Sequence, residues 1–264
     1  MPTLTDPLGH RIQLDKAPRR IVCLVPSITE LLAEYGLEAE VVGITKFCTH
    51  PESWFRQKTR VGGTKTIDVA RIRALRPDLI IANQEENDRA AVEELQRAFP
   101  VYVSRVATLE DAETLYRDIS VLTHKTEVAA QFLERIRITR EKTKARYAGS
   151  RAAYLIWQNP HMVAGGDTYI HAVMDWLGLQ NVFADTKRYP TISLSDCRDR
   201  GAGLILLSSE PFPFAQKHLD ALRAEWSDLT FALVDGRLFS WYGPAFCELD
   251  KLPTRFDQPE IKSS

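Results

Sequence analysis

Cys48 and His50 have the side chains best suited to chemistry, and they stand two positions apart in the polar segment 45–51. A thiol beside an imidazole can act as a nucleophile with its base, or the two side chains can ligate a metal ion. Residues two apart share a face on a strand, but a loop does not guarantee this. No G-x-S-x-G or other nucleophile signature accompanies the pair. Catalysis therefore stands beside ligand contact and plain loop structure as alternatives.

Charged and amide side chains also follow several of the expected strands. Glu85, Glu86 and Asn87 could bind a cation, or Asn87 could cap the following helix while the glutamates lie in solvent or line a site. Lys46 and Lys65 occupy loops where they could meet an anionic ligand or remain solvated. These groups are candidates for ligand contact rather than a signature of one reaction.

Aromatic residues end two strands of the second half of the chain, at Trp157 and at Trp241-Tyr242. Such rings can belong to a core, but at the mouths of loops they offer flat faces to a large planar ligand. We favour ligand contact. The glycine pairs at 62–63 and 165–166 match neither G-x-G-x-x-G nor the P-loop pattern, so tight turns are favoured over nucleotide binding.

Composition limits the classes of protein that this chain can be. It has 264 residues, 44% hydrophobic and 26% charged, with a net charge of −1. This fits a globular protein of one large or two small domains. A net charge near zero does not give the broad positive electrostatic potential expected of a protein that binds nucleic acid or an acidic membrane. The four cysteines form no C-x-x-C, so neither a zinc ribbon nor a redox dithiol is indicated, and Cys23 is expected in the core.

The N-terminal sequence MPTLTDPLGHRIQL has no basic start, apolar stretch or small-residue cleavage site, so it is not a signal peptide. The sequence as given predicts a cytoplasmic protein, or a periplasmic one from which an export signal has been removed. No apolar run approaches the roughly 20 residues that span a bilayer.

The segment 125–149 predicts one long helix, closed by Gly149 as a C-terminal cap. Its apolar stripe thins beyond Ile138, which fits either a helix shared by two lobes or an ordinary surface helix. The stripe consists of Val128, Ala129, Phe132, Leu133 and Ile136.

Short apolar strands alternate with helices on both sides of this segment, which predicts parallel βαβ sheets in two α/β lobes. A small hairpin is expected at 3–14, and strands at 20–25, 41–44, 78–82, 101–103, 152–157, 204–207 and 231–234. We expect Ser27 to cap the first helix with Glu30 at the capping-box position, and Asp68 to cap a later one. Since ligands sit at the carboxyl ends of parallel strands, the loops that follow these strands are the candidate site.

These motifs together resemble a known family. The chain is similar to the bacterial solute-binding proteins whose two lobes are joined by a helical backbone, above all to the cobalamin-binding and iron-complex-binding components of ABC importers. The resemblance covers nearly the whole chain. It is carried by TLTDPLGHRIQL, PRRIVCLVPSITELLAEYGL, VVGIT with the adjacent Cys48-Thr49-His50-Pro51, RVGGT, IRALRPDLIIA, GGDTYIHAVMDWLGLQNVFAD and SWYGP.

The resemblance implies an α/β fold with two Rossmann-like lobes, parallel sheets, one long connecting helix and a cleft between the lobes. The corresponding domains are 1–122, 123–149 and 150–264. Carried over by position, the ligand-binding residues are Pro26, Ser27, Phe47, Lys65, Asn83, Gln84, Glu85, Trp157, Gly165, Arg188, Ser209, Trp241 and Tyr242.

The function that the resemblance implies is non-covalent binding of a corrinoid, haem or ferric siderophore, with no cofactor and no catalysis. The partner is an ABC transporter permease, and the protein is expected to be a monomer that binds no nucleic acid. Family members present one glutamate per lobe to the transporter, whereas here Ala70 precedes Arg71, and Gly243-Pro244 follow the last aromatic pair, with Glu248 further on.

Two other hypotheses remain. The chain could be an enzyme or metal-dependent sensor using Cys48, His50 and Glu85, or a cytosolic scaffold for a metabolite unrelated to metals. Replacing Cys48 and His50 would abolish the turnover of an enzyme but only weaken a binding protein.

Overall fold

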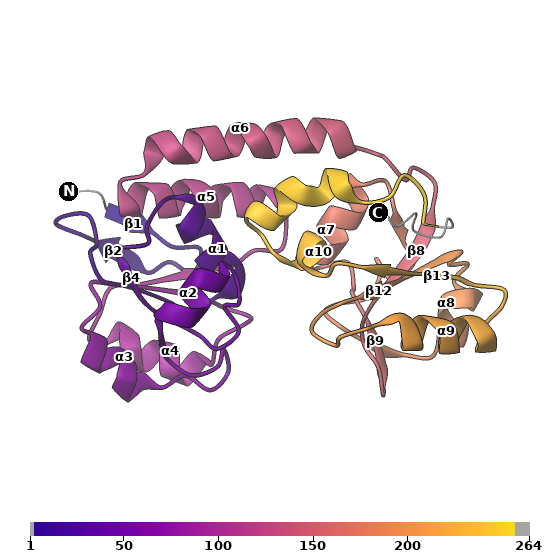
Figure 1. The fold of residues 1–264 in the computed structure, drawn as a ribbon, viewed down its shortest axis with the longest axis horizontal. Coiled ribbons are helices and arrows are strands. Elements are labelled where there is room, and N and C mark those ends of the chain that lie inside the picture. The colour runs from indigo at the N-terminus through magenta and orange to yellow at the C-terminus, as the bar shows by residue number, and fades with distance from the viewer. Residues whose placement is uncertain (1–2, 257–264) are drawn as a thin grey trace. The chain divides into compact units, whose positions relative to one another are not determined.

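The computed structural model describes residues 3–256, whose contacts divide the chain into two compact units. Unit 1 holds the described residues up to Val106 together with Glu110–Arg135 and Tyr242–Pro244. Unit 2 holds Ala107–Leu109, Ile136–Trp241 and the described residues from Ala245 onward. The sequence predicts contiguous segments, whereas both units are assembled from separate stretches of chain. Each unit is an α/β structure (Figure 1), as the sequence predicts.

Unit 1 contains a five-stranded, all-parallel sheet in the order β5-β4-β3-β6-β7. The first of these strands along the chain, β3, lies in the middle, so the strand order reverses between β3 and β6. In open parallel sheets this reversal opens a crevice at the carboxyl ends of the strands. The strands are β3 (Ile21–Cys23), β4 (Val41–Ile44), β5 (Thr59–Arg60), β6 (Leu79–Asn83) and β7 (Val101–Ser104).

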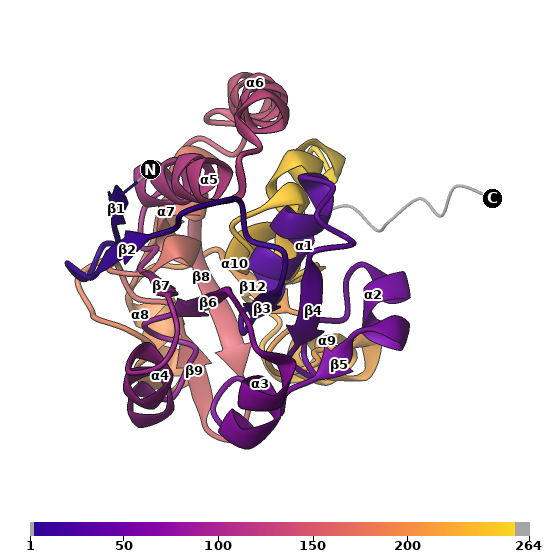
Figure 2. The ribbon, with the colours of Figure 1, turned by 90° about the vertical axis from the view of Figure 1, so that its left-hand side faces the viewer.

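Helices cover both faces of this sheet. Figure 2 shows α3 and α4 on one face and α1 and α5 on the other. Ile72 of α3 and Leu95 of α4 pack in one core cluster with Ile80 of β6. The helices are α1 (Pro26–Glu34), α2 (Glu52–Gln57), α3 (Val69–Leu75), α4 (Arg89–Gln96) and α5 (Leu109–Thr123).

The predicted N-terminal hairpin is present as antiparallel β1 (Thr3–Thr5) and β2 (Arg11–Gln13). The buried carboxylate of Asp6 organises its turn by accepting hydrogen bonds from the backbone N–H of Leu8 at 2.9 Å and of His10 at 2.8 Å. It also accepts one from the N–H of Val103 at 3.1 Å, which joins the hairpin to β7.

Unit 2 contains a six-stranded sheet in the order β11-β9-β8-β12-β13, with β10 paired to the start of β8. Its core is parallel, as the sequence predicts, and β9 and β11 add antiparallel pairs at one side. The short strands β9, β10 and β11 were not expected, because none has an apolar run of its own. The strands are β8 (Arg151–Trp157), β9 (His161–Val163), β10 (Gln180–Asn181), β11 (Thr191–Ile192), β12 (Leu204–Ser208) and β13 (Thr230–Val234).

The core of unit 2 joins the sheet to its helices. Leu155, Ile205 and Phe231 of the sheet pack with Leu219 and Leu222 of α9 in one buried cluster. The helices are α7 (Tyr169–Trp176), α8 (Leu194–Asp199), α9 (Gln216–Glu225) and α10 (Arg237–Ser240), and a 3-10 helix (Pro244–Lys251) begins at the boundary between the units.

The long helix α6 (Thr126–Thr143) is shorter than predicted, because the chain leaves it six residues before Gly149. Beyond Thr143 the backbone N–H of Ala145 donates to the carbonyl of Trp176 at 2.9 Å instead of continuing the helix. The predicted apolar stripe is buried at Phe132, which contacts the ring of Tyr116 edge-on at 5.0 Å. The boundary between the units falls inside α6, between Arg135 and Ile136. No helix in the described range 3–256 is long and apolar enough to cross a membrane.

Of the predicted N-terminal helix caps, two are wrong and one is confirmed. Helix α1 starts two residues earlier than predicted, at Pro26, with Val25 as its N-cap and no side-chain capping bond from Ser27. Proline favours that first position because its missing N–H is not needed there. Helix α4 is capped by Asp88 rather than by Asn87. Asp68 caps α3 as expected, accepting from the N–H of Arg71 at 2.9 Å.

Candidate functional site

The predicted ligand residues divide between the two units. Within each unit they follow strand ends or stand in the loops between strands, and their environments differ enough to separate structural positions from accessible ones. Unit 1 contains Pro26, Ser27, Phe47, Lys65, Asn83, Gln84, Glu85 and Tyr242, and unit 2 contains Trp157, Gly165, Arg188, Ser209 and Trp241.

In unit 1, the strand order reverses beside the turn 83–87 that follows β6. The side chain of Asn83 accepts from the N–H groups of Glu85 at 2.8 Å and Glu86 at 3.1 Å, and it donates to Ser104 at 3.1 Å. Asn87 accepts from the N–H of Asn83 at 2.8 Å. Asn83 and Asn87 are therefore committed to building the turn. Of its other side chains, Gln84 is exposed, and Glu85 and Glu86 are partly buried.

Asn87 also ties this turn to neighbouring loops of unit 1. Its amide nitrogen lies 3.1 Å from the carbonyl of Leu24, just after β3, and 3.2 Å from that of Thr64. Lys65 reaches the same turn from the adjacent loop, because its Nζ donates to the carbonyl of Glu85 at 2.5 Å. The side-chain amide of Asn87 and the ammonium group of Lys65 thus connect the loops that follow β3, β5 and β6.

Phe47 is the most exposed large hydrophobic residue among those described, at 51%. It follows β4, and the Nζ of Lys46 lies 5.1 Å from its ring centroid. A Cβ on Gly63 would lie 3.3 Å from the same ring, so the glycine loop passes directly beneath it. The predicted aromatic contact of unit 1 is therefore accessible in this structure.

The geometry does not support Cys48 and His50 as a catalytic or metal-binding pair. Cys48 is fully buried, with its Sγ 3.1 Å from Oγ1 of Thr29 and 3.2 Å from Oγ1 of Thr45. Burial raises the pKa of its thiol, so the reactive thiolate is disfavoured. The ring of His50 instead contacts the hydroxyl of the adjacent Thr49 at 3.1 Å. Within residues 3–256, no cluster of three or more His, Cys, Asp or Glu side chains could hold a metal ion.

In unit 2, Trp157 ends β8 with 39% of its surface exposed. Phe212, which sequence reasoning missed, packs against it edge to face at 5.7 Å. Phe214 and His218 extend this row of rings, with centroids 4.7 and 5.3 Å from that of Phe212. The signal for the group is the sequence EPFPF at 210–214, which begins two residues beyond the apolar strand β12.

Gly165 is a structural glycine. Its N–H donates to the carbonyl of Arg188 at 2.8 Å, and that of Gly166 donates to Thr186 at 2.8 Å. A Cβ on Gly165 would lie 2.7 Å from the carbonyl oxygen of Thr186, and one on Gly166 only 2.0 Å from that of Ala184. The pair is required by close approach of two backbone segments, whereas the side chain of Arg188 remains exposed.

Glu210 is a second group in unit 2 that sequence reasoning missed. Its Oε1 accepts hydrogen bonds from Oγ of Ser240 and Nε1 of Trp241, each at 2.7 Å. Burial raises the pKa of its carboxyl despite these two bonds, and the charge of Asp235 raises it further while that of Arg237 opposes this. Glu210 therefore holds Trp241 in a fixed orientation.

Tyr242 is held in a corresponding way in unit 1. Its hydroxyl donates to Oε1 of Glu86 at 2.9 Å. Burial raises the pKa of the Tyr242 phenol, and the negative charge of Glu86 adds to this, so the phenol stays protonated as a donor. Trp241 and Tyr242 are only 8% and 5% exposed, in contrast to Phe47 and Trp157.

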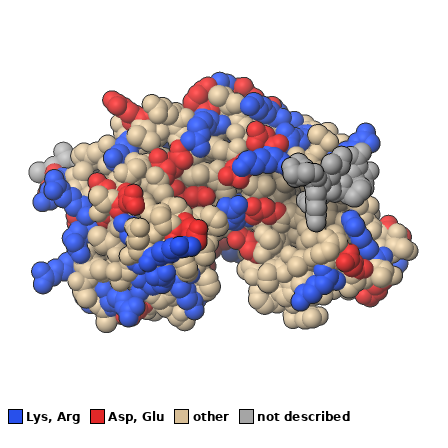
Figure 3. All heavy atoms as spheres, viewed as in Figure 1, with Lys and Arg blue, Asp and Glu red and all other residues tan. Residues whose placement is uncertain are grey.

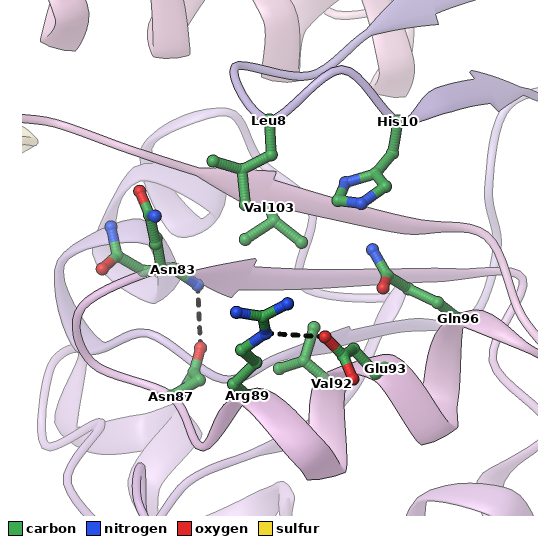
Figure 4. A pocket seen from close by; sticks show the side chains of 10 residues that line it. Leu8, His10, Asn83, Asn87, Arg89, Val92, Glu93, Gln96 and Val103 are labelled. Carbon is green, nitrogen blue, oxygen red and sulfur yellow. Dashed lines mark hydrogen bonds and ion pairs between the residues drawn. The ribbon is translucent and has the colours of Figure 1, made fainter.

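A cavity of about 300 Å³ lies in unit 1. Figure 4 shows its lining side chains, which come from the N-terminal hairpin, β6, β7 and α4. Val92 and Val103 line its apolar side, and Arg89 and Glu93 form an ion pair of 2.7 Å at its edge. Of the predicted ligand residues, Asn83 and Gln84 line it. The amide nitrogen of Gln96 faces this cavity, buried and without a hydrogen-bond partner.

Comparison with known proteins decides what kind of molecule carries these loops. Residues 21–227 match the family described as periplasmic binding protein. The chain belongs to this family. A vitamin B12-binding protein of Vibrio campbellii is 26% identical over 230 residues, which are 84% of this chain and 80% of that protein.

Solved structures share the fold of this periplasmic binding protein. The periplasmic vitamin B12-binding protein BtuF of Vibrio cholerae gives a TM-score of 0.76 at 23% identity, covering 88% of this chain and 93% of that one. The periplasmic haem-binding protein HutB of the same organism gives a TM-score of 0.74 at 19% identity, covering 87% of this chain and 95% of that one. At these identities the likeness establishes the two-lobed α/β fold and not the ligand.

The surface of this family member carries mixed charge. On the face shown in Figure 3, basic and acidic side chains are interspersed, in keeping with the net charge of −1. Ala70, where the resemblance would place a docking glutamate, is exposed on α3. At the second such position, Gly243 is buried, and a Cβ there would lie 3.0 Å from the carbonyl oxygen of Ser27.

Proposed function

We propose that this protein binds a corrinoid as the solute-binding component of an ABC importer. The observation that carries the proposal is an exposed aromatic ring beside the strand ends of each unit, Phe47 in unit 1 and Trp157 in unit 2. Each ring offers exposed apolar surface to a ligand at the place where parallel sheets commonly bind one. The flat face of a macrocycle would bind such a ring by stacking and apolar contact.

The sequence likeness to a vitamin B12-binding protein over most of both chains supports the corrinoid in particular. Haem and ferric siderophores are the competing ligands of the same class. Binding would be non-covalent and need no cofactor. The rings would supply most of the contact, while Lys65 and the accessible groups of the 83–87 turn would fix the polar rim of the ligand.

Import requires release to a permease on the outer side of the inner membrane, so we propose that the protein acts in the periplasm as a monomer. With Ala70 and Gly243 where carboxylates are expected, docking would depend on shape and apolar contact more than on charge pairs. Its affinity for the permease would then change little between low and physiological salt.

The proposal is tested by recording the absorbance spectrum of the purified protein and then titrating it with cobalamin, haem and ferric siderophores while following tryptophan fluorescence. An absorbing ligand near Trp157 should quench emission saturably. Phe47→Ala and Trp157→Ala should each weaken binding by about tenfold, since each removes a stacked ring. Saturable binding of haem or a siderophore but not cobalamin would overturn the corrinoid assignment.

Ile138→Ala is the matched control, because Ile138 is 38% exposed on α6 and away from the strand ends. Its affinity should equal that of the wild type. An equal loss in this variant would show that the effects of Phe47→Ala and Trp157→Ala come from general damage to the surface. Absence of binding to all three ligands would refute the proposed function.

A further inference from the structure

Trp241 and Tyr242 are consecutive in the chain, yet they belong to different units. Each donates its one polar hydrogen to a carboxylate of its own unit: Trp241 to Glu210 at 2.7 Å and Tyr242 to Glu86 at 2.9 Å. Buried tryptophan and tyrosine need hydrogen-bond partners, but a neutral acceptor would satisfy that need. Two carboxylates, one per unit, make a stronger and more directional pair of anchors.

In unit 2, the indole of Trp241 is fixed both at its edge and near its face. Glu210 accepts from its Nε1, and the guanidinium of Arg237 lies 6.0 Å from its ring centroid. Arg237 is itself paired with Asp235 at 2.7 Å. Glu210 also accepts from Ser240 of α10, so its carboxylate cannot turn away without breaking a second bond.

In unit 1, Glu86 stands on a rigid turn. Its backbone N–H donates to Asn83, whose amide also holds Ser104 of the next strand. The segment that carries Tyr242 passes closely over the first turn of α1, where a Cβ on Gly243 would lie 3.0 Å from the carbonyl oxygen of Ser27. Tyr242 is thus held at its hydroxyl by Glu86 and at its backbone by the close packing of the next residue, Gly243, against Ser27.

We propose that Glu86 and Glu210 are positioning residues, each fixing one of the two adjacent aromatic rings in the orientation that the ligand requires. This inference rests on the proposed function and on the sequence-based prediction that Trp241 and Tyr242 contact the ligand. The carboxylates act through the rings and do not themselves contact the ligand. Their loss would leave the rings in place without the hydrogen bond that orients them, so affinity would fall while the fold remained.

The test compares alanine and glutamine at both positions. Glu86→Ala and Glu210→Ala should each weaken ligand binding by about tenfold, since each removes the acceptor that orients the ring. Glu86→Gln and Glu210→Gln keep a carbonyl oxygen as acceptor and should retain affinity within about twofold. Glu52→Ala and Asp199→Ala, at exposed ion pairs of units 1 and 2, serve as controls without effect.

Double variants separate positioning from a general structural role. In a Trp241→Phe background the indole N–H is gone, so adding Glu210→Ala should cost no further affinity. The same holds for Glu86→Ala in a Tyr242→Phe background, which lacks the hydroxyl. If the affinity losses of the glutamate and ring substitutions add fully in the double variants, the inference is overturned. Unchanged affinity in both Glu86→Ala and Glu210→Ala would also overturn it.

A readout without ligand keeps the inference separate from the proposed function. The near-ultraviolet circular dichroism of Trp241, taken as the difference between wild type and Trp241→Phe, reports how rigidly that ring is held. It should be lost in Glu210→Ala and kept in Glu210→Gln. If no ligand binds but this signature behaves as expected, the proposed function fails while the anchoring stands. An unchanged signature in Glu210→Ala would overturn the anchoring itself.

Discussion

The Sγ atom of Cys48 lies 3.1 Å from Oγ1 of Thr29, inside unit 1 and away from solvent. Thr29 belongs to α1, which follows β3, whereas Cys48 follows the next strand, β4. The contact therefore joins two successive strand-end segments through a thiol and a hydroxyl. Cysteine has the most reactive side chain type in this chain, but this contact places Cys48 in the core.

The first prediction is that native Cys48 resists thiol reagents. Burial raises the pKa of the thiols of Cys48, Cys23 and Cys197, and each is fully buried. Cys247 is the partly exposed cysteine of the chain. A chromogenic disulfide reagent should therefore modify at most one thiol in the native protein and four after denaturation. Rapid native labelling of Cys48, identified by peptide mass spectrometry, would contradict this burial.

The second prediction concerns the dependence of stability on pH at Glu210. Burial raises the pKa of its carboxyl above the ordinary value of 4.5. Glu210 then stabilises the fold when protonated, and this contribution is lost as pH rises through the raised pKa. Glu210→Gln is neutral at every pH and avoids this loss. Its melting temperature relative to wild type should therefore increase as the pH rises above the ordinary carboxyl pKa of 4.5.

Thermal unfolding of wild type and Glu210→Gln in matched buffers measures how the difference between their melting temperatures changes with pH. The absolute difference at one pH includes other effects of the amide, so only its change with pH bears on Glu210. Asp235, Arg237, Ser240 and Trp241 are the neighbours that set the pKa of Glu210, and all remain in the variant. A difference that stays constant, or that falls as pH rises, would show that Glu210 is not destabilised by its charge.

The third prediction is that Gly166 is required for folding rather than for binding. A Cβ there would lie 2.0 Å from the carbonyl oxygen of Ala184, a backbone atom that cannot move aside alone. Gly166→Ala should cost about 2–3 kcal/mol of the free energy of unfolding, seen as a melting temperature lowered by roughly 5 °C or more. Gly203→Ala is the matched control, because a Cβ at that site has nothing within 4 Å. Equal melting temperatures for the two variants would refute the steric explanation.

Much of the architecture was predictable because it depends on local patterns. Apolar strands alternating with helices predict both parallel sheets, and the spacing of Ala129, Phe132 and Ile136 predicts the buried face of α6. The end of α6 was not predictable, because the backbone of Ala145 bonds to Trp176, which is far away in sequence. Gly149 is suitably placed to end a helix, but the contact of Ala145 with Trp176 ends α6 earlier.

The site was predictable as a set of loops, but not in the roles of its residues. Phe47 and Trp157 have exposed rings, whereas Asn83 and Gly165 serve the backbone. Sequence spacing cannot distinguish these cases, since it does not show which groups a side chain meets. Glu210 was missed for the same reason, although a carboxylate two residues beyond the buried strand β12 is a signal that could have been weighed.

The fourth prediction is that Asp6 is the main anchor of the N-terminal hairpin. Its carboxylate, with no exposed side-chain surface, accepts from the N–H groups of Leu8, His10 and Val103 and lies 3.0 Å from Nδ1 of His10. Asp6→Ala would leave these donors without a partner, and each buried unsatisfied donor costs about 1–3 kcal/mol. We expect a loss of about 3 kcal/mol in the free energy of unfolding, measured by denaturant titration.

Asp15→Ala, at an exposed carboxylate just beyond the hairpin, should change that free energy by less than about 0.5 kcal/mol. Hydrogen exchange adds a local measurement, because the Val103 N–H bonds only to a side chain from a distant part of the sequence. In Asp6→Ala its protection should fall further than that of Ile80, whose N–H bonds to the carbonyl of Pro100 within the sheet. If both amides keep their wild-type protection, the hairpin is held by its apolar contacts and Asp6 is dispensable.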